Sequence, residues 1–286
     1  MKEDYIIERM DFSNPIDMNK LVELQNTVYA GKHVFTSQIF QHWYCDNPNG
    51  NVVSFNALYG NIIVAHYALI PVKMEIEGRI TSGLLSMATV THPEHRGKGL
   101  FTKLAKMTYE YSAQKGFEFV IGVANANSFP GFIKHLNFQD IGMLDVMIGC
   151  SPKIKASTMK TFKMYWDKST IQWRLGSGRY SKGETSVFGT KAIWKFEKAP
   201  FLHTFMGYVH EDLLAELNIP KVCSIWRPFN LYVGIGSNAR DLGYHDVPKF
   251  IKRSPFHLIF LDLTEGKLPK MTKDNVFFQL MDFDVA

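Results

Sequence analysis

At the centre of this chain stands the sequence Thr91-His92-Pro93-Glu94-His95-Arg96-Gly97-Lys98-Gly99-Leu100-Phe101. The apolar run 83–90 before it predicts a strand, and the apolar spacing after it predicts a helix that ends near Gly116. Its glycines therefore lie in a strand-to-helix turn, where the backbone can approach a ligand and the helix N-terminus offers unpaired N–H groups. Arg96 and Lys98 add full positive charges. Such a turn is typical of an anion site, and a pyrophosphate is the expected anion.

The composition is that of a globular protein with two modules. The chain has 286 residues, of which 46% are hydrophobic and 21% charged. This length exceeds that of a usual domain, so we expect one module over 1–150 and a second over 151–286. The net charge of +5 suits an anionic small ligand. No run of basic residues indicates a nucleic-acid surface, so no nucleic-acid partner is expected.

The cysteines and the N-terminal sequence indicate the cellular compartment in which the protein is expected. Cys45, Cys150 and Cys223 are odd in number and widely spaced, so they predict neither a disulfide framework nor a metal site. A reducing cytoplasm fits this usage best. The N-terminal residues do not resemble a signal peptide, and no apolar run is long enough to span a membrane. We therefore expect a cytoplasmic protein without a metal and without a membrane partner.

The first half predicts a mixed sheet flanked by helices, in the α+β or mixed α/β class. Strands are predicted over 5–10, 52–59, 62–70, 72–76, 80–90, 117–123 and 141–148. Helices are predicted over 16–30, over 35–44, from 100 to the cap at Gly116, and over 132–136 with Asn127 or Ser128 as its cap.

The second half predicts a smaller mixed-sheet module without a phosphate-binding turn. Strands are expected over 201–209, 222–226, 231–235, 257–263 and 276–281, with a short helix over 211–217 and a loop over 176–189. A Trp-to-Pro segment precedes a strand in each half, from Trp43 to Pro48 and from Trp194 to Pro200. This suggests that the second module is a degenerate repeat of the first, although chance explains the match equally well.

The glycine turn resembles the pyrophosphate-binding motif of the GNAT acyltransferase superfamily, R/Q-x-x-G-x-G/A. A later segment, 132–138, is similar to the family's aromatic-x-x-x-x-G-F segment, with Asn137 where glycine is usual. The resemblance covers residues 5–148. In overall plan the chain also resembles two-module bacterial members of the superfamily that act on nucleotide-linked amino sugars.

This resemblance implies binding of acetyl-CoA or another short acyl-CoA as co-substrate. The pyrophosphate would be held by Arg96 and by the backbone N–H groups of Gly97, Lys98, Gly99, Leu100 and Phe101. The main chain around Thr89 and Thr91 would pair with the pantetheine arm, and Asn125 would bond the cofactor or the leaving thiolate. The thioester would lie where the fourth and fifth strands of the fold splay apart.

Two positions depart from the family pattern. Phe101 replaces a small residue and is expected to add bulk near the cofactor. Ile133 falls near the place where many members have a tyrosine that protonates the CoA thiolate, and isoleucine cannot donate a proton. The general acid is therefore absent, supplied from elsewhere, or unnecessary because the thiolate is a good leaving group.

The reaction implied is direct attack of an amine on the thioester, which requires positioning and a base. His92 and Glu94, at the end of the fourth strand, are candidate catalytic residues, against the interpretation that they only form the turn that precedes the helix. His66 is a third candidate, against its interpretation as a core histidine. His33 and His42 are weaker candidates on the acceptor side. Tyr109 and Tyr111 are expected to pack in the core.

By resemblance, the acceptor is a dTDP-type nucleotide-linked amino sugar in surface-glycan synthesis. The second half offers aromatic and basic residues for it, namely Trp173, Arg174, Trp226, Arg227 and Phe229. Two alternatives stand beside this one. The chain could be a catalytically weak or inactive acyl-CoA-binding module, which the missing tyrosine favours slightly, or it could acylate proteins or peptides. A homodimer is left open.

Overall fold

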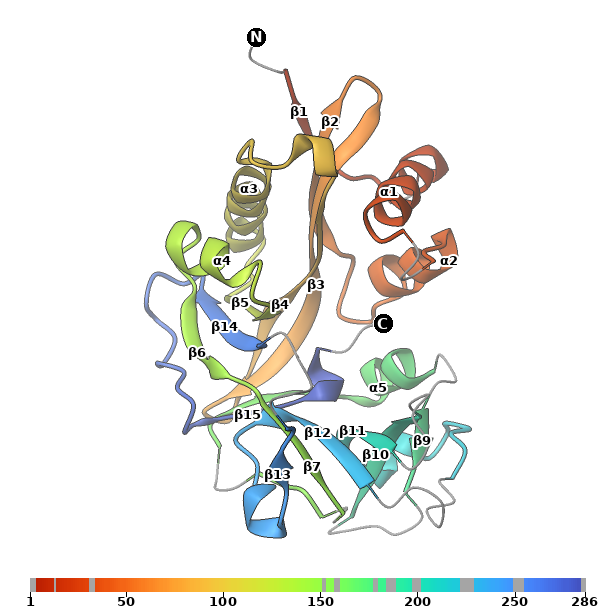
Figure 1. The fold of residues 1–286 in the computed structure, drawn as a ribbon, viewed down its shortest axis with the longest axis vertical. Helices are drawn as coiled ribbons and strands as arrows, with labels where there is room; N and C mark the ends of the chain where they lie inside the picture. The colour runs from red at the N-terminus through yellow and green to blue at the C-terminus, as the bar shows by residue number, and fades with distance from the viewer. Residues whose placement is uncertain are drawn as a thin grey trace. The chain divides into compact units, whose positions relative to one another are not determined.

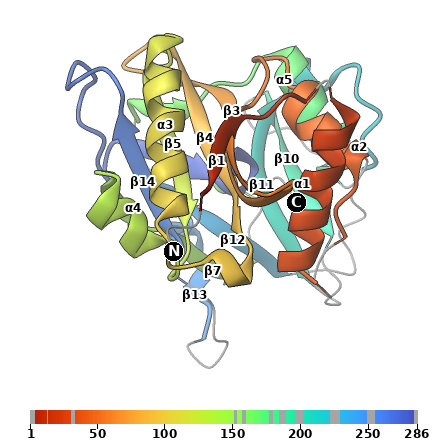
Figure 2. The same ribbon diagram turned by 90° about the horizontal axis from the view of Figure 1, so that it is seen from above.

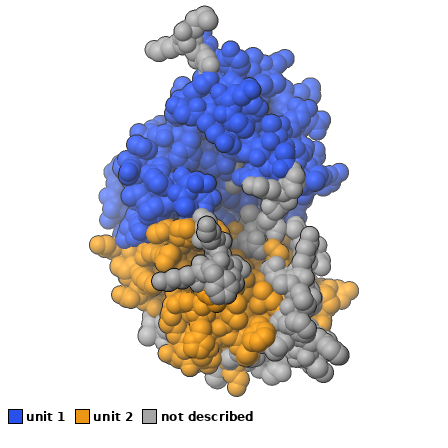
Figure 3. All heavy atoms as spheres, in the orientation of Figure 1, with its two compact units in different colours: residues 1–73, 82–140, 259–269 blue, residues 74–81, 141–258, 270–286 orange. Residues whose placement is uncertain are grey.

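The computed structural model describes residues 4–12, 14–30, 34–150, 153–156, 160–176, 180–183, 189–196, 202–221, 229–248 and 255–283. The chain forms two compact units (Figure 3). Unit 1 comprises 1–73, 82–140 and 259–269, and unit 2 comprises 74–81, 141–258 and 270–286. Neither is one continuous segment. The predicted roles of the two halves, acyl-CoA binding and acceptor binding, stay predictions.

Unit 1 is built on a mixed sheet, as the sequence predicts. Its strands follow the order β1 (Ile6–Arg9), β2 (Val53–Tyr59), β3 (Ile62–Ile76), β4 (Arg79–Thr91), β5 (Phe119–Ala124) and β14 (His257–Asp262) (Figure 1). β2 pairs antiparallel with both β1 and β3, whereas β4 and β5 run parallel. A parallel pair needs a crossover connection, and the helix after the glycine turn supplies it.

β3 is one continuous strand across Pro71, so the prediction of two separate strands, over 62–70 and 72–76, was wrong. Its register with β2 ends at the Val53–Leu69 pair. Pro71 therefore lies beyond the end of β2, where the ladder does not require an N–H from it. Its carbonyl accepts a hydrogen bond from Asn47 Nδ2 at 2.8 Å.

The helices of unit 1 lie on both faces of its sheet. They are α1 (Pro15–Val28), α2 (Ser37–Phe40), which continues into the π-helix η1 (Gln41–Cys45), the 3-10 helix η2 (Pro93–His95), α3 (Leu100–Gln114) and α4 (Phe129–His135). Figure 2 shows α3 and α4 on one face and α1 and α2 on the other. The core under α3 buries Leu104 and Tyr109 against Tyr67, Val120 and Phe138.

The strand predicted over 141–148 is two strands, β6 (Gln139–Met143) and β7 (Asp145–Gly149). Between them Leu144 N donates to Phe256 O at 2.8 Å. Gly142 has φ +141°, a conformation that other residues rarely adopt, so the chain changes course there.

Unit 2 is a second mixed sheet centred on β12 (Phe229–Ile235), which pairs parallel with β11 (Leu202–His210) and antiparallel with β7 and β15 (Val276–Gln279). The other strands are β8 (Phe162–Met164), β9 (Tyr180–Lys182), β10 (Thr190–Phe196) and β13 (His245–Asp246). The helices are α5 (Lys168–Leu175), η3 (Glu211–Leu214), η5 (Arg240–Leu242) and η6 (Leu280–Asp282). The sequence analysis missed α5, β8, β10 and β13, and β9 lies inside the predicted loop 176–189. The strand predicted over 222–226 lies outside the described residues.

The two units share an order of strand pairing. β3 and β4, which lie mainly in unit 1, are neighbours joined by a tight turn, and β4 then pairs parallel with β5. In unit 2, β10 and β11 pair antiparallel, and β11 then pairs parallel with β12. This order favours the repeat hypothesis. The Trp-to-Pro correspondence behind it was wrong, however, because Trp43 lies in the π-helix η1 and Trp194 lies in the strand β10.

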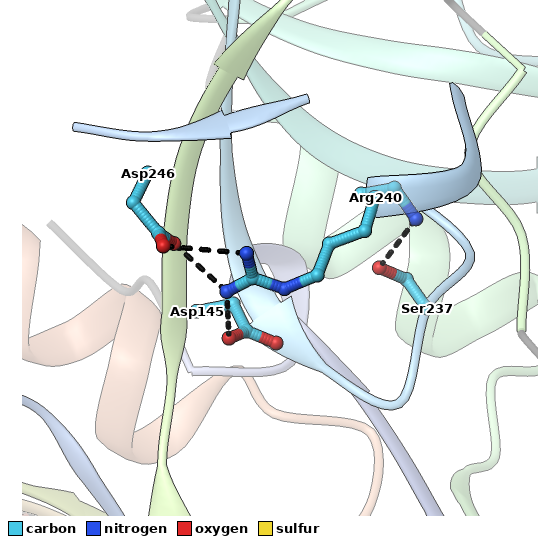
Figure 4. Close-up of polar contacts among 5 residues, drawn as sticks. Asp145, Ser237, Arg240 and Asp246 are labelled. Carbon is cyan, nitrogen blue, oxygen red and sulfur yellow. Dashed lines mark hydrogen bonds and ion pairs between the residues drawn. The ribbon is translucent and has the colours of Figure 1, made fainter. Parts of the chain in front are cut away.

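An arginine joins three elements of unit 2 (Figure 4). The two Nη atoms of Arg240 bond both carboxylate oxygens of Asp246, at 3.2 and 2.8 Å, and Nη2 also reaches Asp145 at 3.3 Å. These carboxylates, Asp246 above all, raise the pKa of Arg240. Because Arg240 is exposed, the cluster contributes little stability, but its two-pronged geometry fixes β13 and η5 beside β7.

Candidate functional site

The glycine turn has the backbone that an anion site needs. Gly97 and Gly99 adopt φ +73° and +75°, and nothing lies within 4 Å of a Cβ built on either. Conformation, not space, therefore requires glycine at both positions. At the start of α3, Lys103 N donates a hydrogen bond to the carbonyl oxygen of the N-cap residue Gly99, at 3.0 Å. The N–H groups of its first turn, those of Leu100 and Phe101 included, precede this bond, as at any helix N-terminus.

Two cations flank this turn, and both are exposed. Arg96 Nε donates to Thr91 O at 3.3 Å, which holds the guanidinium beside the end of β4. Lys98 Nζ lies 5.9 Å from the centre of the Tyr5 ring. The positive end of the α3 dipole and these two side chains together favour an anion.

Phe101 does not add bulk to the turn, which corrects the sequence-based expectation. Its ring packs into the core, with centroids 5.9 Å from Tyr67 and 5.3 Å from Phe132. A Cβ on Gly131 would lie 2.9 Å from this ring, so glycine at 131 makes room for the phenylalanine. Only the backbone of Phe101 is left for the anion.

β4 and β5 separate beyond the glycine-containing pair Ser86–Gly122, the last in their parallel register. β4 continues to Thr91 and β5 to Ala124 without further pairing to each other. A cavity of about 190 Å³ lies at this point. Residues from both strands and from α4 line it, including Ser86, Met87, Thr89, Val123, Asn125 and Phe132. The splay implied by the resemblance is therefore present.

Asn125 has a structural task at this cavity. Its Oδ1 accepts from Asn127 N at 3.0 Å and from Ser128 N at 3.1 Å, just before α4 begins. Ser128, one of the two predicted caps, is the N-cap residue of α4, but its side chain makes no capping hydrogen bond. Because the Asn125 oxygen is occupied, its NH₂ group is the one that can donate to a ligand.

His92 lies at the end of β4, where the sequence predicts it, and acts there as a cap. Its Nδ1 accepts from Glu94 N at 3.4 Å and so begins the 3-10 helix η2. With Nδ1 accepting, a neutral ring carries its proton on Nε2. This geometry favours the turn-forming role over that of a base, and Glu94 is exposed. The next histidine, His95, is buried with Nδ1 2.9 Å from Tyr5 OH, a contact that the sequence gave no sign of.

His66 is buried inside the sheet of unit 1. Its Nδ1 lies 2.7 Å from Asn56 Oδ1 and its Nε2 lies 3.3 Å from Tyr44 OH. Burial lowers the pKa of His66 to about 3, so the ring is neutral at physiological pH. These contacts favour the core-histidine interpretation. Of the acceptor-side candidates, His33 lies outside the described residues, and His42 packs on Trp43 with ring centroids 5.0 Å apart.

A chain of hydroxyls reaches the cavity from the core. Ser86 Oγ lies 2.9 Å from Tyr67 OH, which lies 2.6 Å from Tyr109 OH. Tyr109 is buried, as predicted, but its hydroxyl belongs to a network rather than to apolar packing alone. Ile133, at the family's tyrosine position, packs against the same core.

Two residues offered for the acceptor are core residues instead. Arg174 is buried and donates through Nε to Met281 O at 2.9 Å. Trp173 is also buried. Trp226 and Arg227 lie outside the described residues, and Phe229 is 47% exposed. Among the described residues, no group of three potential metal ligands comes together, and no helix is long and apolar enough to cross a membrane.

Fold and site together define a mixed α/β protein in which a glycine turn with the features of an anion site follows a strand that separates from its parallel neighbour. Residues 11–139 match the acetyltransferase (GNAT) domain family. This match spans less than half of the chain and is a similarity to that family, and it bears out the predicted enzyme class, an acyltransferase. The match does not identify the acceptor.

Solved structures share the fold along most of the chain. A probable N-acyltransferase of Enterococcus faecalis has a TM-score of 0.62 at 9% identity, covering 91% of this chain and 73% of that one. A GCN5-related N-acetyltransferase of Kribbella flavida has a TM-score of 0.60 at 11% identity, covering 92% and 73%. N-myristoyltransferase of Saccharomyces cerevisiae with bound myristoyl-CoA has a TM-score of 0.56 at 9% identity, covering 91% and 83%. The TM-scores show likeness of fold and confirm the mixed α/β class, and at these low identities they show nothing beyond the fold. No curated protein matches the chain.

Proposed function

We propose that unit 1 binds an acyl-CoA along β4 and transfers its acyl group to a primary amine. One observation carries this proposal: the end of β4 leads directly from the cavity at the Ser86–Gly122 pair to the glycine turn. Between them, residues 87–91 are extended and span roughly 16 Å at about 3.3 Å per residue. That length suits an extended pantetheine arm. The pyrophosphate would then lie on the backbone of Gly97–Phe101 and the thioester in the cavity.

The chemistry proposed is direct attack of the amine on the thioester carbonyl. Positioning alone can lower the barrier by about 7–11 kcal/mol, so a strong base is not required. His92 and Glu94 stay candidates for the base, with the reservation that the His92 Nδ1 is engaged as a cap. Asn125 is the proposed side-chain donor to the cofactor.

The narrower proposal concerns the acceptor, a dTDP-type amino sugar, and it rests on the resemblance of the chain's plan to such enzymes. Trp173 and Arg174 do not support it, because both are buried. The exposed ring of Phe229 does offer a stacking surface in unit 2. A cytoplasmic setting is part of the proposal, and the free thiols of Cys45 and Cys150 are consistent with it.

A thiol-release screen tests both levels of the proposal. Acetyl-CoA and a longer acyl-CoA are each combined with a dTDP-linked amino sugar, the free amino sugar and a peptide with a free N-terminus. Saturable release with the nucleotide-linked sugar alone is the expected result. Release with the peptide alone would overturn the acceptor and favour protein acylation. Saturable CoA binding without release on any amine would favour the inactive binding module.

A further inference from the structure

The hydroxyl chain of Ser86, Tyr67 and Tyr109 connects the thioester cavity to the core of unit 1. Ser86 is partly exposed at the cavity, while Tyr67 and Tyr109 are buried. The two phenols lie under α3 among apolar side chains. Buried hydroxyls are costly unless both their donor and acceptor capacities are used. The direction in which this chain donates therefore matters.

The direction of donation along the hydroxyl chain follows from its buried end, Tyr109. Among the described residues, the only hydrogen-bond partner of Tyr109 OH is Tyr67 OH. If Tyr67 donated to Tyr109, the proton of Tyr109 would have no acceptor in the core. The arrangement of lower energy therefore has Tyr109 donating to Tyr67, and Tyr67 donating to Ser86. Ser86 is then left with a proton to donate, and the cavity that it lines is where an acceptor would be found.

The two phenols of the hydroxyl chain stay protonated at the pH at which a CoA thiol ionises. Burial raises the pKa of Tyr67 to about 12 and raises the pKa of Tyr109 well above its usual value. A CoA thiol, with a pKa close to that of cysteine at about 8.5, ionises long before either phenol does. The chain can therefore donate a hydrogen bond to a thiolate, but it does not transfer a proton to one. Donation along successive hydroxyls polarises each bond and strengthens the last donor.

We infer that Ser86 donates a hydrogen bond to the CoA sulfur as it leaves, and that Tyr67 and Tyr109 are positioning residues for this donor. The inference rests on the proposed function. In the step concerned, the amine nitrogen forms a bond to the thioester carbon, and the carbon–sulfur bond breaks with its electron pair on sulfur. The products are the amide, the CoA thiolate held by Ser86, and one proton released to water.

With Ser86 as the donor, the site has a hydrogen-bond donor although Ile133, at the position of the family's tyrosine, cannot donate one. Phe132 of α4 lines the same cavity as Ser86, so the donor on β4 and the family's tyrosine position on α4 approach one site. A donor on β4 replaces one on α4. The glycine opposite Ser86, Gly122, leaves space beside the hydroxyl that a side chain at 122 would occupy.

The test measures the thiol pKa of bound CoA, from the ultraviolet absorbance of its thiolate, with desulfo-CoA as the blank. In Ser86→Ala, that pKa should rise by roughly one to two units, since a hydrogen bond to a charged group is lost. In Tyr109→Phe, it should rise by a few tenths of a unit, because cooperativity along the chain is modest. Ser82→Ala makes the same change at an exposed site on β4 and should leave the pKa unaltered.

The outcomes separate this inference from the proposed function. Failure of the wild type to bind CoA would overturn the proposed function. Binding with the same thiol pKa in wild type, Ser86→Ala and Tyr109→Phe would overturn the role of Ser86 and leave acyl transfer standing. If Ser86→Ala does not fold, Tyr109→Phe decides the matter, because a merely structural hydroxyl pair would alter stability but not the thiol pKa.

Discussion

Ser86 on β4 and Gly122 on β5 form the last pair in their parallel register, and a Cβ on Gly122 would lie 3.1 Å from the Cβ of Ser86. This contact is tighter than ordinary van der Waals packing. Glycine therefore lets the two strands stay paired up to the edge of the cavity. Beyond this pair the strands are no longer paired, and the cavity in which we propose that the thioester lies begins.

Gly122→Val should fill the cavity without touching the glycine turn. We expect CoA still to bind, while thiol release falls by at least about tenfold, which corresponds to about 1.4 kcal/mol. Overpacking should also cost about 1–3 kcal/mol of stability. Gly122→Ala gives a graded comparison with a smaller group. Turnover by Gly122→Val at the wild-type rate would show that the thioester lies elsewhere.

Gly99→Glu should abolish CoA binding. It forces a side chain into the left-handed conformation and places a negative charge at the N-terminus of α3, where an anion is to bind. Titration calorimetry with CoA is the measurement, and a loss of affinity of about a hundredfold or more, roughly 2.8 kcal/mol, is expected. Gly78→Glu is the matched control, since Gly78 has φ +82° with open space around it. Equal affinities of Gly99→Glu and wild type would refute the pyrophosphate assignment.

The glycine turn could be predicted because its information is local. Gly97 and Gly99 adopt the left-handed conformations that their positions imply, and Asn137, where the family has glycine, has φ +56°. The hydroxyl chain could not be predicted in this way. Tyr67 meets Ser86 across β3 and β4 and meets Tyr109 on α3, and no periodicity of one segment encodes such contacts.

The second unit was predicted less well, again for physical reasons. α5 begins with a capping box made by Asp167 and Thr170, but the helix buries polar as well as apolar residues and so lacks a clear apolar face. Arg174 illustrates this, because a residue type expected at the surface lies in the core. The return of residues 259–269 to unit 1 depends on strand pairing over a long sequence separation, which the chain's local pattern does not reveal.

Acid should destabilise unit 1 through His66. Its pKa is lowered by burial to about 3 in the folded state, against about 6.5 when unfolded. The folded state thus binds fewer protons between these values, so this contribution to stability is present above pH 6.5 and is lost as the pH falls. Urea unfolding should show a loss on the order of 2 kcal/mol between about pH 6.5 and pH 5.

His66→Gln is the comparison for this pH effect. It keeps a polar side chain beside Asn56 and Tyr44 but does not titrate. Its urea midpoint should change less with pH over this range than that of the wild type. Parallel losses in both proteins would mean that His66 is not the group responsible.

Asp282 should act in the opposite direction in unit 2. Burial raises the pKa of its carboxyl to about 7, even though Gln279 N and Trp166 Nε1 donate to it at 2.7 and 3.1 Å. The folded state binds more protons than the unfolded state between pH 3.8 and pH 7. Its contribution is therefore complete below pH 3.8 and declines as the pH rises through 7, by at most on the order of 4 kcal/mol.

Asp282→Asn resembles the protonated carboxyl and removes this titration. The variant should accordingly unfold at a higher urea concentration than the wild type at pH 8, with the difference vanishing near pH 4. A difference that is independent of pH would instead assign the effect to altered packing, and would show that folding does not raise the pKa of Asp282.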